Sequence, residues 1–290
     1  MGSAAAPAQV RRWMGFVAGL TVLFIRPLAA LSVYAYNHDL HSHILLVPFI
    51  AAYLLYTGRA SLPAPGRRSV AGTVVLAGVG ITAAAAGIAW RGSVSVNDDL
   101  ALMTLAFVSL VAAGGFLFLG RGWMAAAAFP FAFLIFMVPL PDAAANWLEK
   151  ASALASAEAA ALYFTAAGTT LVRHGTVFEL PGIVLEVGQE CSGIRSSWVL
   201  FITSVLASHL FLRNWGSRLA LVAFVIPLGI LRNGFRVFVI GLLCVYIGPH
   251  MIDSVIHHRG GPLFFALSLV PLFLLAWWLR RRERRTNLPG

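Results

Sequence analysis

Charged residues are scarce in this 290-residue chain. They make up 11% of it, and Asp and Glu together number 11. A soluble globular domain usually carries about a quarter charged residues, so this shortage, together with 59% hydrophobic residues and a mean hydropathy of +0.83, excludes that class. Long apolar runs are present instead. We therefore predict an all-α polytopic membrane protein, with residues 1–290 forming a single integral membrane domain.

Cysteine is also rare, because the chain contains only Cys191 and Cys244. Two cysteines in so long a chain exclude a disulfide scaffold, although counting alone leaves open one bridge between them. Cys244 lies inside an apolar run and is interpreted as an inert packing residue.

Eight apolar segments are marked by their length, which predicts about eight transmembrane helices. They cover residues 13–36, 44–56, 70–90, 100–119, 124–140, 194–212, 219–247 and 263–279. The first is longer than a signal-peptide core and lacks an obvious cleavage site, so we expect a retained span with a kink at Arg26-Pro27. The second is short and is expected to borrow residues from 41–43, whereas the seventh is long and is expected to tilt or break near Asn233-Gly234.

The net charge of +10 would suggest a nucleic-acid partner in a soluble protein. Here, however, the arginines fall in alternate loops and in both tails, which is the pattern that sets membrane topology. We therefore predict no nucleic-acid partner and an N-in/C-in orientation. Residues 37–43, 91–99, 141–190 and 248–261 are expected to lie outside.

The long external segment, residues 140–190, is expected to have two parts. Over 142–167, Trp147, Leu154 and Leu162 recur at helical spacing, which predicts an amphipathic helix at the membrane interface. Over 169–187, β-branched residues and turn signals at 173–175 and 180–182 predict a small hairpin. The hairpin leads to Cys191, just before the sixth span.

Cys191 stands where a polar segment meets that span, so its thiol is expected at the water interface. A helix beginning after it would offer unpaired N–H groups that favour a thiolate, Gly193 would allow close backbone approach, and Arg195 adds positive charge. The alternative is that Cys191 is a small apolar residue at the start of a helix.

The seventh span contains two arginines, Arg232 and Arg236, one helical turn apart. A cation inside an apolar run is costly and indicates a polar cavity or a functional site. Alternatively, either arginine snorkels to the interface or pairs with a carboxylate such as Glu190. The next loop supplies His257 and His258 on the same predicted side as Cys191. A thiol, a cation and an imidazole together are what acyl transfer through a thioester requires.

Three motifs now resemble those of the exosortase/archaeosortase transpeptidases. Glu190-Cys191-Ser192-Gly193-Ile194-Arg195-Ser196 matches the family's cysteine motif, Asn233-Gly234-Phe235-Arg236 its N-x-x-R motif, and residues 257–261 its H-x-x-x-G motif. An early stretch, 42–48, also resembles the family's S-H-x-x-L-V-P region. The resemblance covers nearly the whole chain.

The resemblance implies that Cys191 is the nucleophile, Arg236 the cation that stabilises the oxyanion or orients the substrate, and His257 the acid/base. Supporting or alternative residues are His258, Arg195, Asn233, Glu190, Arg232 and His43. The implied enzyme is a cysteine peptidase/transpeptidase of the bacterial cytoplasmic (inner) membrane with its site on the external side. Its substrates would be membrane-anchored proteins with a PEP-CTERM-like sorting signal, made of a short motif, a helix and a basic tail.

Two other interpretations remain. The stretch 37–43 holds three histidines and Asp39, as a metal site could, but its spacing fits no helix face, and we predict no metal and no cofactor. The second is a non-enzymatic carrier or assembly subunit for exported polysaccharide, in which the arginine pair binds anionic lipid-linked sugars.

Overall fold

The computed structural model describes residues 5–187, 193–253 and 261–286. Its contacts divide the chain into two compact units, Met1–Ala144 and Ala145–Gly290, and each is described by itself. Within the described residues, six helices are long and apolar enough to cross a membrane, or up to eight if each of two bent pairs counts as one span. The prediction of a mostly helical, multi-pass membrane protein is confirmed.

The first unit is a helical bundle built on the pair α4 (Val70–Ala89) and α5 (Val96–Phe118). Glycine lets these helices approach closely, since a Cβ on Gly80 would lie 2.8 Å from Leu110 Cγ. A Cβ on Gly87 would lie 2.8 Å from Met103 Cε. Close contact between small and large side chains is how apolar helices associate where the surrounding solvent is itself apolar.

The first predicted span is bent. α1 (Ala5–Leu23) and α2 (Ile25–Asn37) meet at Phe24 with an angle of 73°, which confirms the predicted kink. Pro27 lies in the first turn of α2, where a missing N–H costs little because that group has no partner within the helix. The second span also follows the prediction. η1 (Asp39–Leu45), α3 (Val47–Gly58) and η2 (Arg59–Ser61) form one 23-residue candidate span that includes residues 41–43.

The predicted continuous fifth span over 124–140 is wrong. The chain forms three short pieces there, α6 (Arg121–Ala126), α7 (Ala128–Phe133) and η3 (Leu134–Met137). Local packing explains the breaks, because Trp123, Phe131 and Phe133 are all buried and the pieces turn these large side chains into the bundle. An apolar run therefore need not be one helix.

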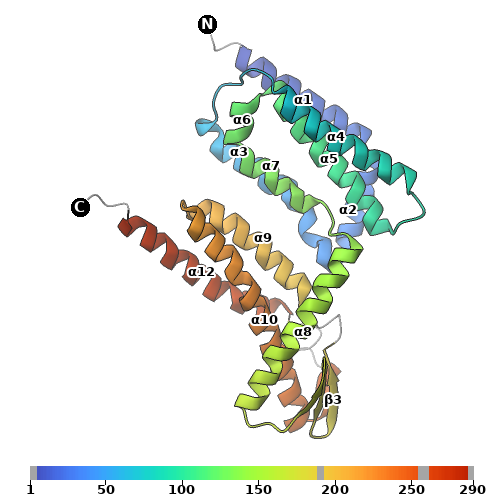
Figure 1. Ribbon diagram of the computed structural model, residues 1–290, viewed down its shortest axis with the longest axis vertical. Helices are drawn as coiled ribbons and strands as arrows, with labels where there is room; N and C mark the ends of the chain where they lie inside the picture. The colour runs from blue at the N-terminus through green and yellow to red at the C-terminus, as the bar shows by residue number, and fades with distance from the viewer. Residues whose placement is uncertain (1–4, 188–192, 254–260, 287–290) are drawn as a thin grey trace. The chain divides into compact units, whose positions relative to one another are not determined.

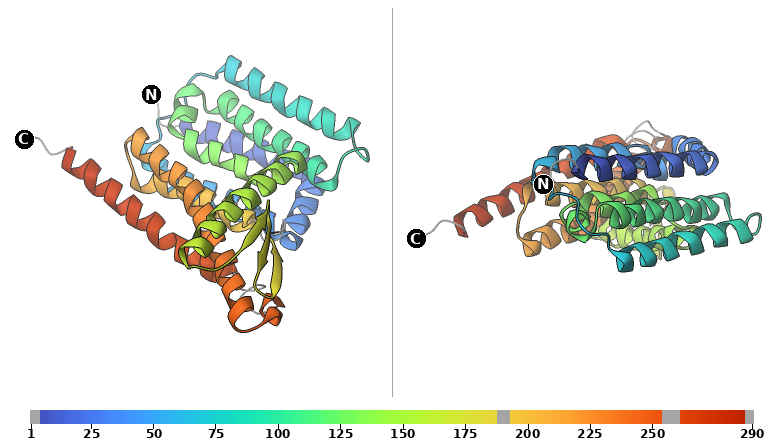
Figure 2. Two further views of the ribbon diagram at one scale, coloured as in Figure 1. Left: turned by 60° about the horizontal axis from the view of Figure 1, so that its bottom comes forward. Right: turned by 90° about the horizontal axis from the view of Figure 1, so that it is seen from above.

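The second unit contains α8 (Asp142–Ala166, from Ala145 on), a small sheet, α9 (Ile194–Phe211), α10 (Trp215–Tyr246), η5 (Pro249–Asp253) and α12 (Gly261–Thr286). α9, α10 and α12 lie side by side (Figures 1 and 2) and share a core in which Leu200, Leu221 and Leu272 are fully buried. α10 runs through Asn233-Gly234 without interruption, so of the tilt or break expected for this long span the break is wrong.

The sheet extends the predicted hairpin by one strand. β1 (Val172–His174), β2 (Val177–Leu180) and β3 (Ile183–Glu186) are antiparallel in that order, with β2 in the centre. Gly175 (φ 63°) and Gly182 (φ 82°) make the two tight turns, because both need the left-handed backbone region. Phe178 and Leu185 pack with Phe164 of α8 and Ile240 of α10 into one apolar cluster.

α8 packs through a face different from its apolar stripe. Trp147, Leu154 and Leu162 are 52–68% exposed, whereas the buried face consists mainly of small residues, among them Ala153, Ser156, Ala157, Ala159 and Ala160. Small side chains allow a neighbouring helix to come close. The large apolar residues are left at the surface, where a membrane interface would meet them.

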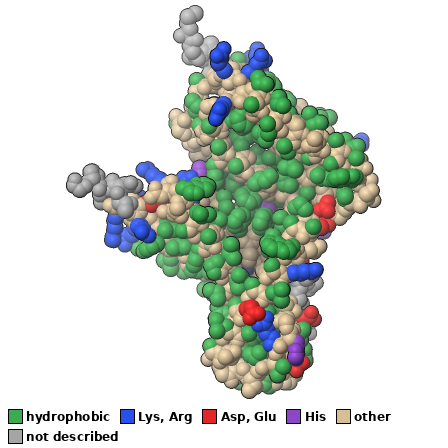
Figure 3. Space-filling model, viewed as in Figure 1, with side chains coloured by type: hydrophobic (Ala, Val, Ile, Leu, Met, Phe, Trp, Pro, Cys, Tyr) green, Lys and Arg blue, Asp and Glu red, His purple; other side chains and the backbone are tan. Residues whose placement is uncertain are grey.

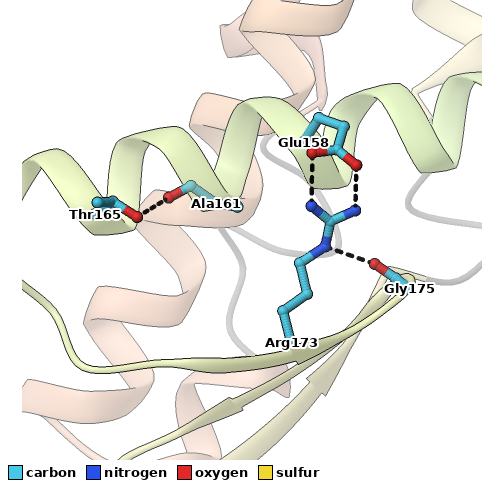
Figure 4. A network of polar contacts seen from close by, with 5 residues as sticks. All are labelled: Glu158, Ala161, Thr165, Arg173 and Gly175. Atoms are coloured by element: carbon cyan, nitrogen blue, oxygen red, sulfur yellow. Dashed lines mark hydrogen bonds and ion pairs between the residues drawn. The ribbon is translucent and has the colours of Figure 1, made fainter.

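Arg173 ties the sheet to α8 (Figure 4). Its two terminal nitrogens each donate to Glu158 at 2.8 Å, and its Nε donates to the Gly175 carbonyl at 2.7 Å. The hydrogen bond to Glu158 raises the pKa of the Arg173 guanidinium above its ordinary value. The ion pair therefore orients β1 against α8, although an exposed pair such as this adds little stability.

Candidate functional site

Gly193 begins α9 in a conformation that favours glycine. Its backbone is left-handed, with φ 68° and ψ 8°, which an L-residue with a side chain rarely adopts. A Cβ at this position would also lie 2.6 Å from Asn233 Oδ1 and 2.7 Å from Asn233 Cγ. Two independent constraints therefore select glycine two positions after Cys191.

Asn233, in the middle of α10, is only 2% exposed and lies against this glycine. Gly193 belongs to the cysteine motif and Asn233 to the N-x-x-R motif, so the fold brings together two motifs that lie far apart in the sequence. Buried polar side chains persist in apolar helices where they have polar neighbours.

Arg232 makes a second connection between the same two helices. Its Nη2 donates to the Gly193 carbonyl at 3.2 Å and to Ser197 Oγ at 3.0 Å, and the side chain is 8% exposed. Gly229, one turn earlier on α10, makes room for this contact, since a Cβ there would lie 2.9 Å from Ser197 Oγ. Sequence reasoning gave Arg232 no clear role, whereas the structure shows that it anchors the first turn of α9.

The Gly193 carbonyl is the acceptor on which this turn is organised. Besides Arg232 Nη2, it accepts from Ser197 N at 3.0 Å and from Ser196 Oγ at 3.1 Å. The start of α9 is thereby fixed, and its remaining N–H groups point back along the helix axis toward the preceding residues. The arrangement favours a negative charge just before α9.

Arg236 lies one turn beyond Arg232 on α10 and is half-buried. Between them, Gly234 brings α10 onto α8, since a Cβ there would lie 2.5 Å from Ala159 Cβ and 2.9 Å from Ala160 N. α10 is thus held between α8 and α9 at the level of its two arginines. A half-buried guanidinium in such a place can bind a carbonyl or carboxylate oxygen with two parallel hydrogen bonds.

The other predicted site residues lie in different parts of the chain. Arg195 is exposed on the first turn of α9. His43 belongs to the first unit, where it lies half-buried in η1. Glu190, Cys191, His257 and His258 lie outside the described residues, so their roles stay predictions. The described chain on either side of them, at Val187, Gly193, Asp253 and Gly261, belongs to the second unit throughout.

The remaining cysteine and the histidine cluster are also placed. Cys244 is free and 3% exposed in the cluster that joins α8, the sheet and α10, as expected of a packing residue. In the first unit, His41 is 5% exposed beside Tyr34. Across residues 5–187, 193–253 and 261–286, no three His, Cys, Asp or Glu side chains gather as they would around a metal ion.

Sequence reasoning missed Ser197 and the anchoring role of Arg232. A signal was present, because Gly229 and Arg232 are spaced three residues apart on one face of α10 and Ser197 follows Gly193 by one helical turn. Neither segment alone encodes which helices pair or in which register they pack.

Fold and site together define a multi-pass helical membrane protein whose polar motifs meet where α9 starts beside α10. A family model described as "Transmembrane exosortase (Exosortase_EpsH)" matches residues 35–274, which include all of α9 and α10 but neither α1 nor the last turns of α12. The chain belongs to the transmembrane exosortase family. Exosortases are membrane transpeptidases that process PEP-CTERM proteins. No curated protein and no solved structure matches the chain.

Proposed function

We propose that this exosortase cleaves C-terminal sorting signals of exported, membrane-anchored proteins through a thioester on Cys191. The observation that supports it best is the contact between the two motifs, in which Arg232 and Asn233 of α10 hold Gly193, two positions after the cysteine. The helix start that follows Cys191 favours a thiolate there.

The proposed reaction has two halves. The Cys191 thiolate attacks the carbonyl carbon of the scissile peptide, and Arg236 stabilises the oxyanion that forms. His257 then gives a proton to the departing amine, which leaves with the signal helix, and a thioester remains. In the second half, an acceptor nucleophile gives its proton to His257, attacks the thioester carbonyl and releases the thiolate.

The proposed substrate fits a membrane-embedded site. A signal made of a short PEP-like motif, one apolar helix and a basic tail can pack beside the spans with its tail inside, in the N-in/C-in orientation. Holding the motif at the height of Cys191 makes the attack effectively intramolecular. Remote contacts along the helix thereby contribute to the rate at the reacting bond.

Cellular processing tests this function. A secreted reporter ending in a PEP-like motif, an apolar helix and an Arg-rich tail is co-expressed with the wild type, Cys191→Ala, Cys191→Ser or Arg236→Lys, and its size is followed by immunoblot. We expect cleavage only with the wild type, because the thiolate and the planar guanidinium are both required. Cys244→Ser is the matched control and keeps activity. Cleavage by Cys191→Ala at the wild-type rate would contradict the proposal.

A further inference from the structure

A cavity of about 460 Å³ lies where the loop between α9 and α10 meets the last turns of α12. Its wall carries one carboxylate, one imidazole and four guanidinium groups, namely Glu283, His209, Arg213, Arg218, Arg280 and Arg284. Figure 3 shows basic side chains gathered at the end of α12. The positive charge therefore comes from two parts of the chain that are distant in sequence and meet around one cavity.

Glu283 does not neutralise this cluster by itself, because it is one carboxylate among four arginines. It is 6% exposed and accepts hydrogen bonds from the backbone N–H of Arg213 at 2.9 Å and of Asn214 at 3.0 Å. These bonds fasten the α9–α10 loop to α12. The carboxylate thus builds the wall of the cavity while the excess charge stays positive.

Two of the arginines are held in place by contacts within the wall. Arg218 is half-buried, and its Nε donates to the Leu212 carbonyl at 2.9 Å. The guanidinium of Arg280 lies over the Phe211 ring, 5.9 Å from its centroid. Cations that are already positioned lose less conformational entropy when an anion binds.

Aromatic side chains near this cavity are of the kind that gathers at the level of lipid headgroups. Trp215, Trp277 and Trp278 are exposed at the same ends of α10 and α12, and tryptophan gathers where a membrane meets water. Arg281 lies 4.5 Å from the Trp277 ring centroid, so cation and indole share that level. Leu210, in the wall of the cavity, is exposed and offers an apolar surface for acyl chains.

We propose that this cavity binds the phosphate of an anionic phospholipid headgroup. Guanidinium groups bind phosphate oxygens with paired, charge-assisted hydrogen bonds, and basic pockets between membrane helices suit anionic headgroups. The bound lipid bridges the α9–α10 loop and the end of α12 and stabilises their packing within the second unit. This site lies at the opposite end of α9 from Gly193 and does not depend on the proposed peptide cleavage.

Lipid binding to the purified full-length protein tests the proposal. Dissociation constants for phosphatidylglycerol and phosphatidylcholine are measured by native mass spectrometry for the wild type, for Arg218→Gln/Arg280→Gln, and for the control Arg67→Gln/Arg68→Gln, which loses the same charge in the first unit. We expect phosphatidylglycerol binding to weaken at least tenfold in the cavity variant, since each basic residue near a membrane surface contributes about fivefold. The control should stay within about twofold.

Three results would overturn this site: equal weakening in both double variants, equal binding of both lipids by the wild type, or displacement of the lipid by millimolar inorganic phosphate, which would mean a site for soluble anions. If the cavity variant does not yield folded protein, the exposed Arg284→Gln is used alone. About fivefold weaker phosphatidylglycerol binding would then support the site, and unchanged binding would exclude it.

Discussion

Arg232 is a buried cation in an apolar helix, and such a residue is costly unless its N–H groups are bonded. Its bonds to the Gly193 carbonyl and Ser197 Oγ hold the helix start next to Cys191. We expect Arg232→Met to lower kcat for signal cleavage at least tenfold with little change in KM, because the nucleophile is displaced while substrate contacts remain. Arg232→Lys should recover part of the rate.

A control separates this effect from general loss of charge. Arg68→Met removes a cation from the first unit and should leave both parameters unchanged. Equal effects on kcat and KM in Arg232→Met, without rescue by lysine, would mean that Arg232 contacts the substrate or supports only folding.

Gly193 offers a test of the helix start itself. An alanine there combines a left-handed backbone, which costs about 1–2 kcal/mol, with a clash against buried Asn233. Gly168→Ala is the matched control, because Gly168 has a similar φ of 69° but no atom within 4 Å of the position that a Cβ would take. We expect the midpoint of thermal unfolding to fall further in Gly193→Ala than in Gly168→Ala. Signal cleavage should be lost only in Gly193→Ala. Equal losses would deny the contact with Asn233.

Helix packing makes a prediction at Gly234, where α10 comes close to α8. A Cβ there would meet Ala159 and the backbone of Ala160, and overpacking of this kind costs about 1–3 kcal/mol. Gly234→Ala should therefore lower the midpoint of thermal unfolding, whereas Gly216→Ala on the same helix, with open space around it, should not. A stable Gly234→Ala variant would contradict the close approach of these helices.

Individual elements could be predicted from the sequence where length and apolarity decide. α4, α5 and α9 lie within a few residues of their predicted spans, and the bend near Pro27 follows from proline chemistry. The breaks in the fifth span and the small-residue contact face of α8 could not be predicted. In a membrane the large apolar side chains face the lipid as readily as the protein, so hydrophobicity alone does not mark the packed face.

At the scale of the whole molecule, three sequence motifs were enough to predict membership of the exosortase family. The contact between the cysteine motif and the N-x-x-R motif could not be predicted from the sequence. Arg232, Asn233 and Gly193 meet only because α9 and α10 pair in one register, which depends on Gly229 and Ser197 fitting together. Long-range pairing of this kind has no local sequence pattern.

Orientation is a prediction for the whole chain. The arginine distribution predicts that Cys191 faces outside while both termini and Ser217, in the first turn of α10, face inside. In intact spheroplasts carrying Cys244→Ser, a membrane-impermeant thiol reagent should label Cys191. A Ser217→Cys variant that also carries Cys191→Ser should react only after permeabilisation. The reverse labelling pattern would invert the topology.

The covalent intermediate is the most direct consequence of a cysteine transpeptidase. Purified enzyme is mixed with a synthetic sorting signal, quenched in acid and analysed by intact-protein and peptide mass spectrometry. We predict an adduct with the mass of the acyl fragment on the peptide that contains Cys191. Hydroxylamine should remove this adduct, as it removes thioesters. The Cys191→Ser variant should form no adduct that hydroxylamine removes. Two results together would contradict the thioester. The wild type would release the signal without an adduct on Cys191 under rapid quenching, and Cys191→Ala would release it undiminished.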